Sequence, residues 1–183
     1  MAFLDNLAIV ACVIIDYHSL VTIFEKVSIE RLGFPYVSTL LSFREGPPMI
    51  NLIKSIEFRP DIFLINSQGI AHPMLCGCAS HVGVLANAPT IGVAAQKLCG
   101  EYDHQPEKVG DYVPLNFDGK PVGWVLKSKE KCRQIYVSPG HLVSLNSSID
   151  IVVECVKNHK LPEPLYLAHT LANEKKRKMA QTH

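Results

Sequence analysis

The chain has 183 residues, of which 48% are hydrophobic and 19% charged, and its 18 Lys and Arg against 17 Asp and Glu give a formal net charge of +1. This length predicts one domain over residues 1–183, and the apolar fraction excludes a disordered chain. The near-zero charge excludes binding to nucleic acid through bulk charge, so any such contact needs a local patch.

The first third of the chain predicts a hairpin and a helix. Residues 7–17 are β-branched and almost continuously apolar, which is typical of a strand buried on both faces. Residues 20–29 follow a short polar break and predict a second, antiparallel strand. Pro47 and Pro48 predict the start of a helix, because the missing N–H costs nothing in its first turn.

The middle of the chain alternates between strands and a helix. Residues 61–66 predict a short buried strand that ends in a turn at residues 67–69. The small residues of 76–88 are suited to a close-packed helix, and residues 90–94 predict a further buried strand. Polar side chains after such strands lie where sites form in α/β sheets.

The last third predicts a second hairpin and two helices. The hairpin is expected from residues 123–128 and 133–138, after a stretch rich in Gly, Asp and Pro. Ser144 is a candidate N-cap for a helix over residues 144–160, and residues 162–178 predict the closing helix. The order of elements predicts an α/β fold in which helices cover a mixed sheet.

Several polar groups are candidates for chemistry, and each has a simpler alternative. Arg44 and Glu45 form a charge pair just before the predicted helix, and the simpler alternative is that Glu45 only interacts with the helix dipole. Residues 66–73 are either a site after a buried strand or a plain turn. His169 is either catalytic or a packed helical histidine. The basic run 175–178 is either a solvated helix end or a phosphate contact.

A zinc site is a remote alternative, and the cysteines indicate a reducing compartment. His72, Cys76, Cys78 and His81 lie close in sequence, but C-x-C is not the usual spacing of zinc ligands. The N-terminus lacks the basic region of a secretory signal, and no apolar run is long enough to span a membrane. We therefore expect a cytoplasmic protein with reduced thiols and no membrane partner.

Five segments together resemble the endonuclease V family, in order and with few gaps. They are FPYVSTLLSFREGP, INSQGIAHP, ASHVGVLANAPTIGVA, YVSPGHLVSL and LPEPLYLAHTLAN. The resemblance implies a ribonuclease H-like fold and Mg²⁺-dependent cleavage one nucleotide 3′ of deoxyinosine in DNA or inosine in RNA, with Mn²⁺ as a possible substitute. It implies inosine-containing DNA or RNA as the partner and gives no sign of an obligate protein partner.

The resemblance also implies roles for individual residues. The family's wedge, which separates strands once the inosine has turned out of the stack, matches Pro35, Tyr36, Val37 and Ser38. Positions that line the hypoxanthine pocket match Leu41, Ser67, Gly69, Ile70 and Gly77. The metal positions match Glu45 and Asn66, and histidines near the cleaved phosphate match His72 and His169. A hard cation and a nearby histidine suit phosphodiester hydrolysis.

The sequence departs from the family pattern at the catalytic centre. Asn66 stands where the family has a metal-binding Asp, and Ser67 replaces the following glycine. Ala95 replaces a lysine and Met74 an arginine, while Lys97 would point elsewhere. We expect weak Mg²⁺ binding at most, because an amide brings no charge.

The N-terminal alignment predicts a further loss. The family's Gly-Val-Asp strand, central in its sheet, would end just before Ala2, so we expect the chain to lack it; Asp5, in the turn that follows, is a poor substitute. Two functions stay open: an inosine-binding protein that does not cut, which we favour, and an active endonuclease V that uses Glu45 and Asn66.

Overall fold

The computed structural model describes residues 1–35, 37 and 40–181, and the chain divides into two compact units. Unit 1 comprises Met1–Pro60 and Pro164–His183, and unit 2 comprises Asp61–Glu163. In the described residues, no helix has the length and apolar character needed to cross a membrane.

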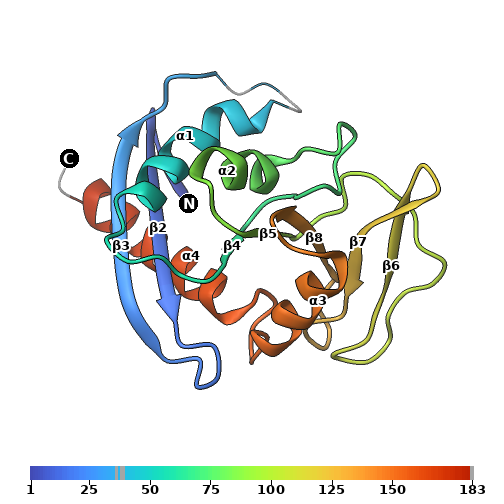
Figure 1. Ribbon diagram of the computed structural model, residues 1–183. Coiled ribbons are helices and arrows are strands. Elements are labelled where there is room, and N and C mark those ends of the chain that lie inside the picture. Colours follow the sequence, from blue (N-terminus) through green and yellow to red (C-terminus); the bar gives the residue numbers. More distant parts are fainter. Residues whose placement is uncertain (36, 38–39, 182–183) are drawn as a thin grey trace. The chain divides into compact units, whose positions relative to one another are not determined.

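Unit 1 contains a three-stranded antiparallel sheet (Figure 1). Strands β2 (Leu7–Ile15) and β3 (Thr22–Arg31) pair directly, which confirms the predicted hairpin. A short strand that was not predicted, β1 (Ala2–Leu4), pairs with the start of β2, and the turn between them contains Asp5, as predicted. The family's Gly-Val-Asp strand was expected to end just before Ala2. That the chain lacks this strand stays a prediction.

Strand β2 is buried on both faces, as its apolar run predicted. Ala8 and Val10 belong to one apolar cluster, which includes Leu52 of the first helix. Ile9 points to the opposite face, because side chains alternate along a strand, and it packs with Ala172 of the last helix. The sheet of unit 1 therefore has a helix on each face.

The first helix begins earlier than predicted. Helix α1 spans Leu41–Lys54, so Pro47 and Pro48 lie inside it and not at its start. Glu45 is accordingly a helical residue and not part of a preceding loop. The prediction failed because the preference of proline for the first turn of a helix takes no account of tertiary packing. Gly46 and Pro48 are buried, and this packing outweighs the helix hydrogen bonds that two prolines cannot donate.

Unit 2 is built on a mixed five-stranded sheet with the order β4-β5-β8-β7-β6. Strands β4 (Phe63–Ile65) and β5 (Thr90–Ala94) are parallel, and the other neighbours are antiparallel. The predicted strand at residues 90–94 is confirmed. The predicted second hairpin is confirmed by β7 (Lys120–Leu126) and β8 (Ile135–His141).

Strand β6 (Tyr112–Phe117) was missed by the sequence analysis. Pro114 argues against a strand, because proline cannot donate to a ladder. β6 is the edge strand of its sheet, where one side needs no partner, and Val113 and Leu115 are buried at alternate positions. The edge position therefore accommodates the proline.

The three predicted helices after β4 are all present. Helix α2 (Cys78–Ala86) packs against β4, β5 and β8, and α3 (Leu145–Glu154) packs against β7 and β8. Ser144 caps α3 as predicted, because its side chain accepts a hydrogen bond from the Ser147 N–H. Helix α4 (Glu163–Ala180) ends in exposed basic residues, which agrees with a solvated helix end.

None of the six cysteines, all of which lie in the part of the chain that the structure describes, forms a disulfide bond. Burial raises the pKa of the Cys12 and Cys155 thiols to about 11, so both stay protonated at neutral pH. Protonated thiols are poor nucleophiles and poor metal ligands. These two cysteines therefore serve as small apolar side chains, as their surroundings in the sequence predicted.

Candidate functional site

The loop that follows β4 is fixed to β8 by its own backbone. The Gly69 N–H donates to Ser138 Oγ at 2.9 Å, and the Ile70 N–H donates to Pro139 O at 2.8 Å. Sequence analysis placed Gly69 and Ile70 in a base-binding pocket. Because both N–H groups already have partners, any reading of a base by these backbone groups falls to their carbonyl oxygens, which keep a second lone pair.

The same loop caps helix α2. The Gly77 N–H donates to Gly69 O at 2.8 Å, and the Ala79 N–H donates to Gln68 O at 2.9 Å. These N–H groups belong to the free donors at a helix start, which are often available to anions. Two of them are occupied by loop carbonyls, so this helix start has fewer donors left for a phosphate.

Gly92 makes the close packing of the loop possible. A Cβ atom at Gly92 would collide with the Gly69 nitrogen, the Gln68 carbonyl carbon and the Ser67 oxygen, all of them backbone atoms. Gly77 has the same property on the other side, where a Cβ would collide with the Gln68 and Gly69 oxygens. The backbone of residues 67–69 thus lies directly on two glycines.

Gln68 is the buried side chain of this loop, and sequence analysis assigned it no role. Only 8% of its surface is exposed, and its Nε2 donates to Gln96 O, just beyond β5, at 2.8 Å. Its Oε1 is buried and has no hydrogen-bond partner among the described residues. An unpaired buried acceptor costs about 1–3 kcal/mol, so a donor from water or a ligand would be favoured there.

His72 ends the loop as a buried, neutral histidine. Its surface is 6% exposed, and its Nδ1 accepts a hydrogen bond from the Met74 N–H at 3.2 Å. Burial lowers the pKa of His72 below its ordinary value of 6.5. The imidazole therefore carries its proton on Nε2, because Nδ1 is the acceptor.

Three of the four positions that depart from the expected pattern are exposed, and the fourth, Ser67, is partly buried. Asn66 follows β4 directly and is exposed, and Ala95 follows β5 and is exposed. Met74 is 72% exposed. Lys97 does not replace the family lysine, because its Nζ lies 5.5 Å from the centroid of the Tyr102 ring. None of the exposed side chains among these is needed to fill the core of unit 2.

In unit 1, Arg44 ties helix α1 to the start of the predicted wedge. Its Nη1 donates to Phe34 O at 2.8 Å, and its guanidinium lies 5.8 Å from the centroid of the Phe3 ring. Glu45 is the next residue and is half-buried. Burial raises the pKa of Glu45, and the positive charges of the N-terminus and Arg44 oppose this.

The described part of the predicted wedge is apolar and exposed. Pro35 is exposed, and Val37 is 39% exposed. The Val37 carbonyl accepts a hydrogen bond from the Leu40 N–H at 3.1 Å, which leads the chain into α1. Tyr36 and Ser38, the other predicted wedge residues, lie outside the described residues.

The remaining predicted residues are also in unit 1. Leu41 is the first residue of α1 and is partly buried. His169 lies in α4 with an exposed side chain, and its carbonyl accepts from Asn173 Nδ2 at 2.9 Å. The predicted site therefore divides between the units. Wedge, Leu41, Glu45 and His169 belong to unit 1, and Asn66 to Gly77 belong to unit 2.

A metal centre of acidic, histidine or cysteine ligands is not found in the described residues. No three such side chains are grouped so that they could hold a metal ion, and this includes the four residues considered for zinc. Glu45 and Asn66 have oxygen atoms, which Mg²⁺ prefers, but only Glu45 brings charge. The donors present fit a strong Mg²⁺ site poorly.

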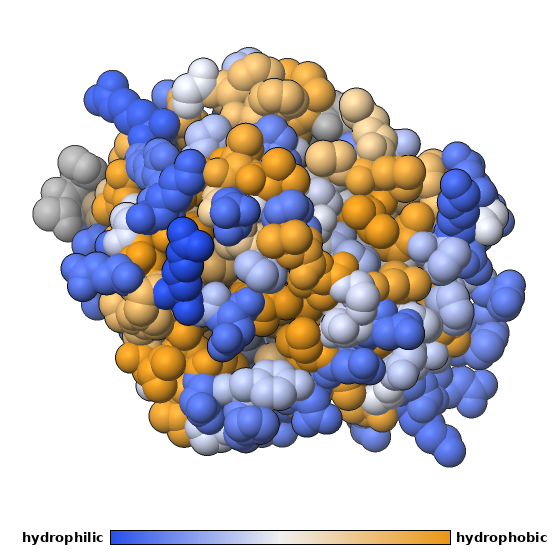
Figure 2. All heavy atoms as spheres, viewed as in Figure 1, coloured by the Kyte–Doolittle hydropathy of each residue, from blue (hydrophilic) through white to orange (hydrophobic). Residues whose placement is uncertain are grey.

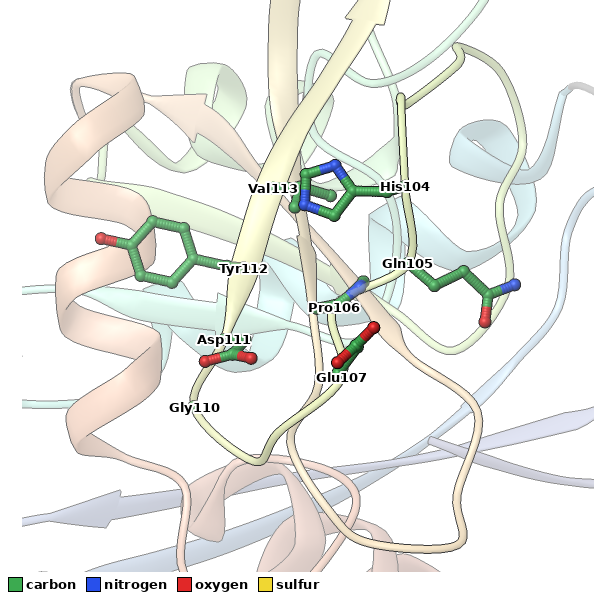
Figure 3. A pocket seen from close by; sticks show the side chains of 8 residues that line it. All are labelled: His104, Gln105, Pro106, Glu107, Gly110, Asp111, Tyr112 and Val113. Atoms are coloured by element: carbon green, nitrogen blue, oxygen red, sulfur yellow. The ribbon is translucent and has the colours of Figure 1, made fainter.

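A hollow of about 530 Å³ lies elsewhere in unit 2 and contains no predicted site residue (Figure 3). It is lined by His104, Gln105, Pro106, Glu107, Gly110, Asp111, Tyr112 and Val113. Asp111 Oδ2 accepts from the Lys108 N–H at 2.9 Å, so this carboxylate serves the local turn.

Exposed apolar side chains occur in both units. Phe43 of α1 is 52% exposed, and Leu75 and Leu142 of unit 2 are 52% and 66% exposed. Figure 2 shows hydrophobic side chains interspersed with hydrophilic ones over the face that it draws. Aromatic side chains such as Phe43 can stack on unpaired bases.

Comparison with known proteins identifies a family of nucleases. The sequence model described as Endonuclease V matches residues 2–170. The Endonuclease V of Protochlamydia amoebophila is 42% identical over 166 residues, which cover 88% of this chain and 69% of that protein. The Endonuclease V of Roseiflexus castenholzii is 38% identical over 91% of this chain and 75% of its own. The chain belongs to the endonuclease V family.

Solved structures agree with this assignment. The Bacillus subtilis endonuclease V structure superposes with a TM-score of 0.89 at 28% identity, covering 97% of this chain and 81% of that one. The Ciona intestinalis endonuclease V, in complex with a 24mer DNA containing an inosine followed by a ribo-adenosine, superposes with a TM-score of 0.81 at 26% identity, covering 96% and 81%. The predicted α/β fold of this family is therefore confirmed.

The packing on Gly92 predicts a large cost for an added methyl group. Gly92→Ala should lower the free energy of unfolding by about 1–3 kcal/mol, because its neighbours are backbone atoms that cannot rotate away. Chemical denaturation measures this. Gly33→Ala is the control, because a Cβ there meets nothing within 4 Å. Equal stability of Gly92→Ala and Gly33→Ala would contradict the close approach.

The lowered pKa of His72 predicts a dependence of stability on pH. As the pH falls below about 6.5, the unfolded chain takes up a proton before the folded protein does. The free energy of unfolding should therefore fall, by at most about 1.4 kcal/mol per pH unit. His72→Asn should remove this part of the slope and keep an acceptor for Met74. The exposed His104→Asn is the control, and an unchanged slope in His72→Asn would refute the prediction.

Proposed function

We propose that this chain recognises inosine-containing DNA or RNA and that its cleavage of the phosphodiester bond is impaired. Membership of the endonuclease V family supports the substrate class. The observation that carries the proposal is the loop Asn66–His72, which is rigidly held although the residues expected to perform the chemistry beside it have changed. A loop kept in place without its catalytic acid is suited to binding.

The groups of this loop are chemically suited to hypoxanthine. The Gly69 and Ile70 N–H groups are occupied within the protein, and Gln68 Oε1 has no partner among the described residues. The free capacity of these residues therefore lies in acceptors. Hypoxanthine carries an N1–H donor, whereas N1 of adenine is itself an acceptor. An acceptor that faces N1 of the bound base would therefore favour inosine over adenosine.

Unit 1 supports the same proposal through the wedge. Arg44 holds Phe34 beside helix α1, and exposed apolar residues follow directly. An apolar wedge can occupy the space that a base leaves when it turns out of a duplex. Arg44 is then a positioning residue for recognition of duplex substrates.

Impaired cleavage follows from the donors available for a divalent cation. The family's chemistry uses a metal that stabilises charge on the phosphate and lowers the pKa of water. Here Glu45 alone brings a carboxylate, Asn66 offers a neutral amide, and no acidic group of three exists among the described residues. We infer from these donors that a divalent cation binds weakly, and we derive no cleavage step through one.

Binding and cutting should be measured together on matched oligonucleotides. Single-stranded DNA and RNA with one inosine, or with adenosine at that position, are incubated with the protein in Mg²⁺ or Mn²⁺. We expect the inosine strands to bind about tenfold more tightly. Hypoxanthine N1–H gains a hydrogen bond to an acceptor, whereas adenine N1 would be repelled by it. Cleavage should be slow or absent.

Two outcomes would overturn parts of this proposal. Efficient cutting 3′ of inosine that disappears in Glu45→Ala would show an active endonuclease with a reduced metal site. Equal binding of inosine and adenosine strands would remove inosine recognition itself. Duplex substrates test the wedge separately, because only a duplex needs its strands held apart.

A single substitution should restore part of the metal site. Asn66→Asp is expected to raise the affinity for Mn²⁺ by about tenfold or more, since it adds a negative charge directly after β4. Isothermal titration measures the change. Gln96→Glu, which adds the same charge at an exposed position after β5, is the control. Equal effects of the two variants would exclude Asn66 as a metal ligand.

A further inference from the structure

Lys160 brings a positive charge to the end of strand β5. Its Nζ donates to the Ala95 carbonyl at 3.4 Å, and Ala95 is the first residue after β5. The Lys160 carbonyl accepts a hydrogen bond from Ser128 Oγ at 2.6 Å. Ser128 is 2% exposed, so the backbone of Lys160 is attached to a buried residue while its side chain reaches toward Ala95.

The topology of unit 2 places this charge at the edge that carries the candidate site. Strands β4 and β5 are parallel, and β8 is antiparallel to both β5 and β7, so β4, β5 and β7 all point the same way. Asn66, Ala95 and Ser128 follow these strands in turn. All three therefore lie at the carboxyl edge of the sheet, where ligands bind in many α/β folds.

The chemistry of the Lys160 ammonium suits an anion. An ammonium has three donors, and the bond to Ala95 O uses one of them. That partner is a neutral carbonyl, which leaves the charge of the lysine uncompensated by this bond. Charge-assisted hydrogen bonds to phosphate oxygens are stronger than neutral ones.

We propose that Lys160 contacts a phosphate of the bound nucleic acid and takes the place of a cation at residue 95. This rests on the proposed function, since it assumes a nucleic-acid strand at this edge. Ala95 itself offers only a methyl group. Lys97, two residues further on, lies over the Tyr102 ring and does not reach this position.

The test measures how oligonucleotide binding by the full chain depends on salt. Removing one phosphate contact lowers the slope of log affinity against log salt by about 0.7 for a single strand. Lys160→Gln keeps a donor for Ala95 O but removes the charge. We expect about 3- to 10-fold weaker binding at ~50 mM salt, a slope smaller by about 0.7, and equal effects on inosine and adenosine strands.

Two further variants make the test specific. Lys97→Gln removes a nearby ammonium group that lies over the Tyr102 ring. The salt dependence of binding by this variant should therefore equal that of the wild type. Ala95→Lys added to Lys160→Gln should restore both affinity and slope, because it returns a cation to the same place. Thermal unfolding shows whether each variant remains folded.

The outcomes separate this inference from the proposed function. A wild-type slope in Lys160→Gln, or weaker binding without a change of slope, would overturn the phosphate contact. A smaller slope that does not recover in the double variant would overturn the placement at residue 95. If the wild type binds inosine and adenosine strands equally but Lys160→Gln has the smaller slope, inosine recognition fails and the phosphate contact stands.

Discussion

The backbone of residues 67–69 rests on Gly92 without any intervening side chain, and much of unit 2 depends on this contact. It brings the loop near enough to β8 for Gly69 and Ile70 to donate to Ser138 and Pro139. It also presents two carbonyls to the first N–H groups of α2. Strand, loop and helix are thereby joined mainly through main-chain atoms, and Ser138 Oγ is the one side-chain atom among these contacts.

The two units fix their candidate residues in different ways. In unit 2 the loop is held by three backbone–backbone hydrogen bonds and by the bond from Gly69 N–H to Ser138 Oγ. In unit 1 a side chain does this work, since the Arg44 guanidinium joins α1 to Phe34 and lies over Phe3. A bond made by a long side chain is removed by one substitution, whereas a backbone hydrogen bond survives most of them.

The sequence predicted the elements whose pattern is local and failed where tertiary packing decides. The buried strand at residues 90–94 and the Ser144 cap are confirmed, because apolar runs and N-cap chemistry are properties of a few consecutive residues. Helix α1 was wrongly expected to begin at Pro47, and strand β6, which contains Pro114, was missed. Burial offsets the missing N–H in the helix, and the edge position offsets it in the strand. The resemblance indicated Gly69 and His72, but no local pattern marks Gln68 or Lys160, whose contacts are distant in sequence.

The exposure of residues 66, 74 and 95 has a consequence for how this protein can change. Each lies at the surface beside a loop that its own backbone holds in place. Replacing these side chains leaves the core and the hydrogen bonds of the loop intact. Under the proposed function, mutation at these positions can therefore change reactivity without loss of stability, so few substitutions separate a binding protein from a nuclease.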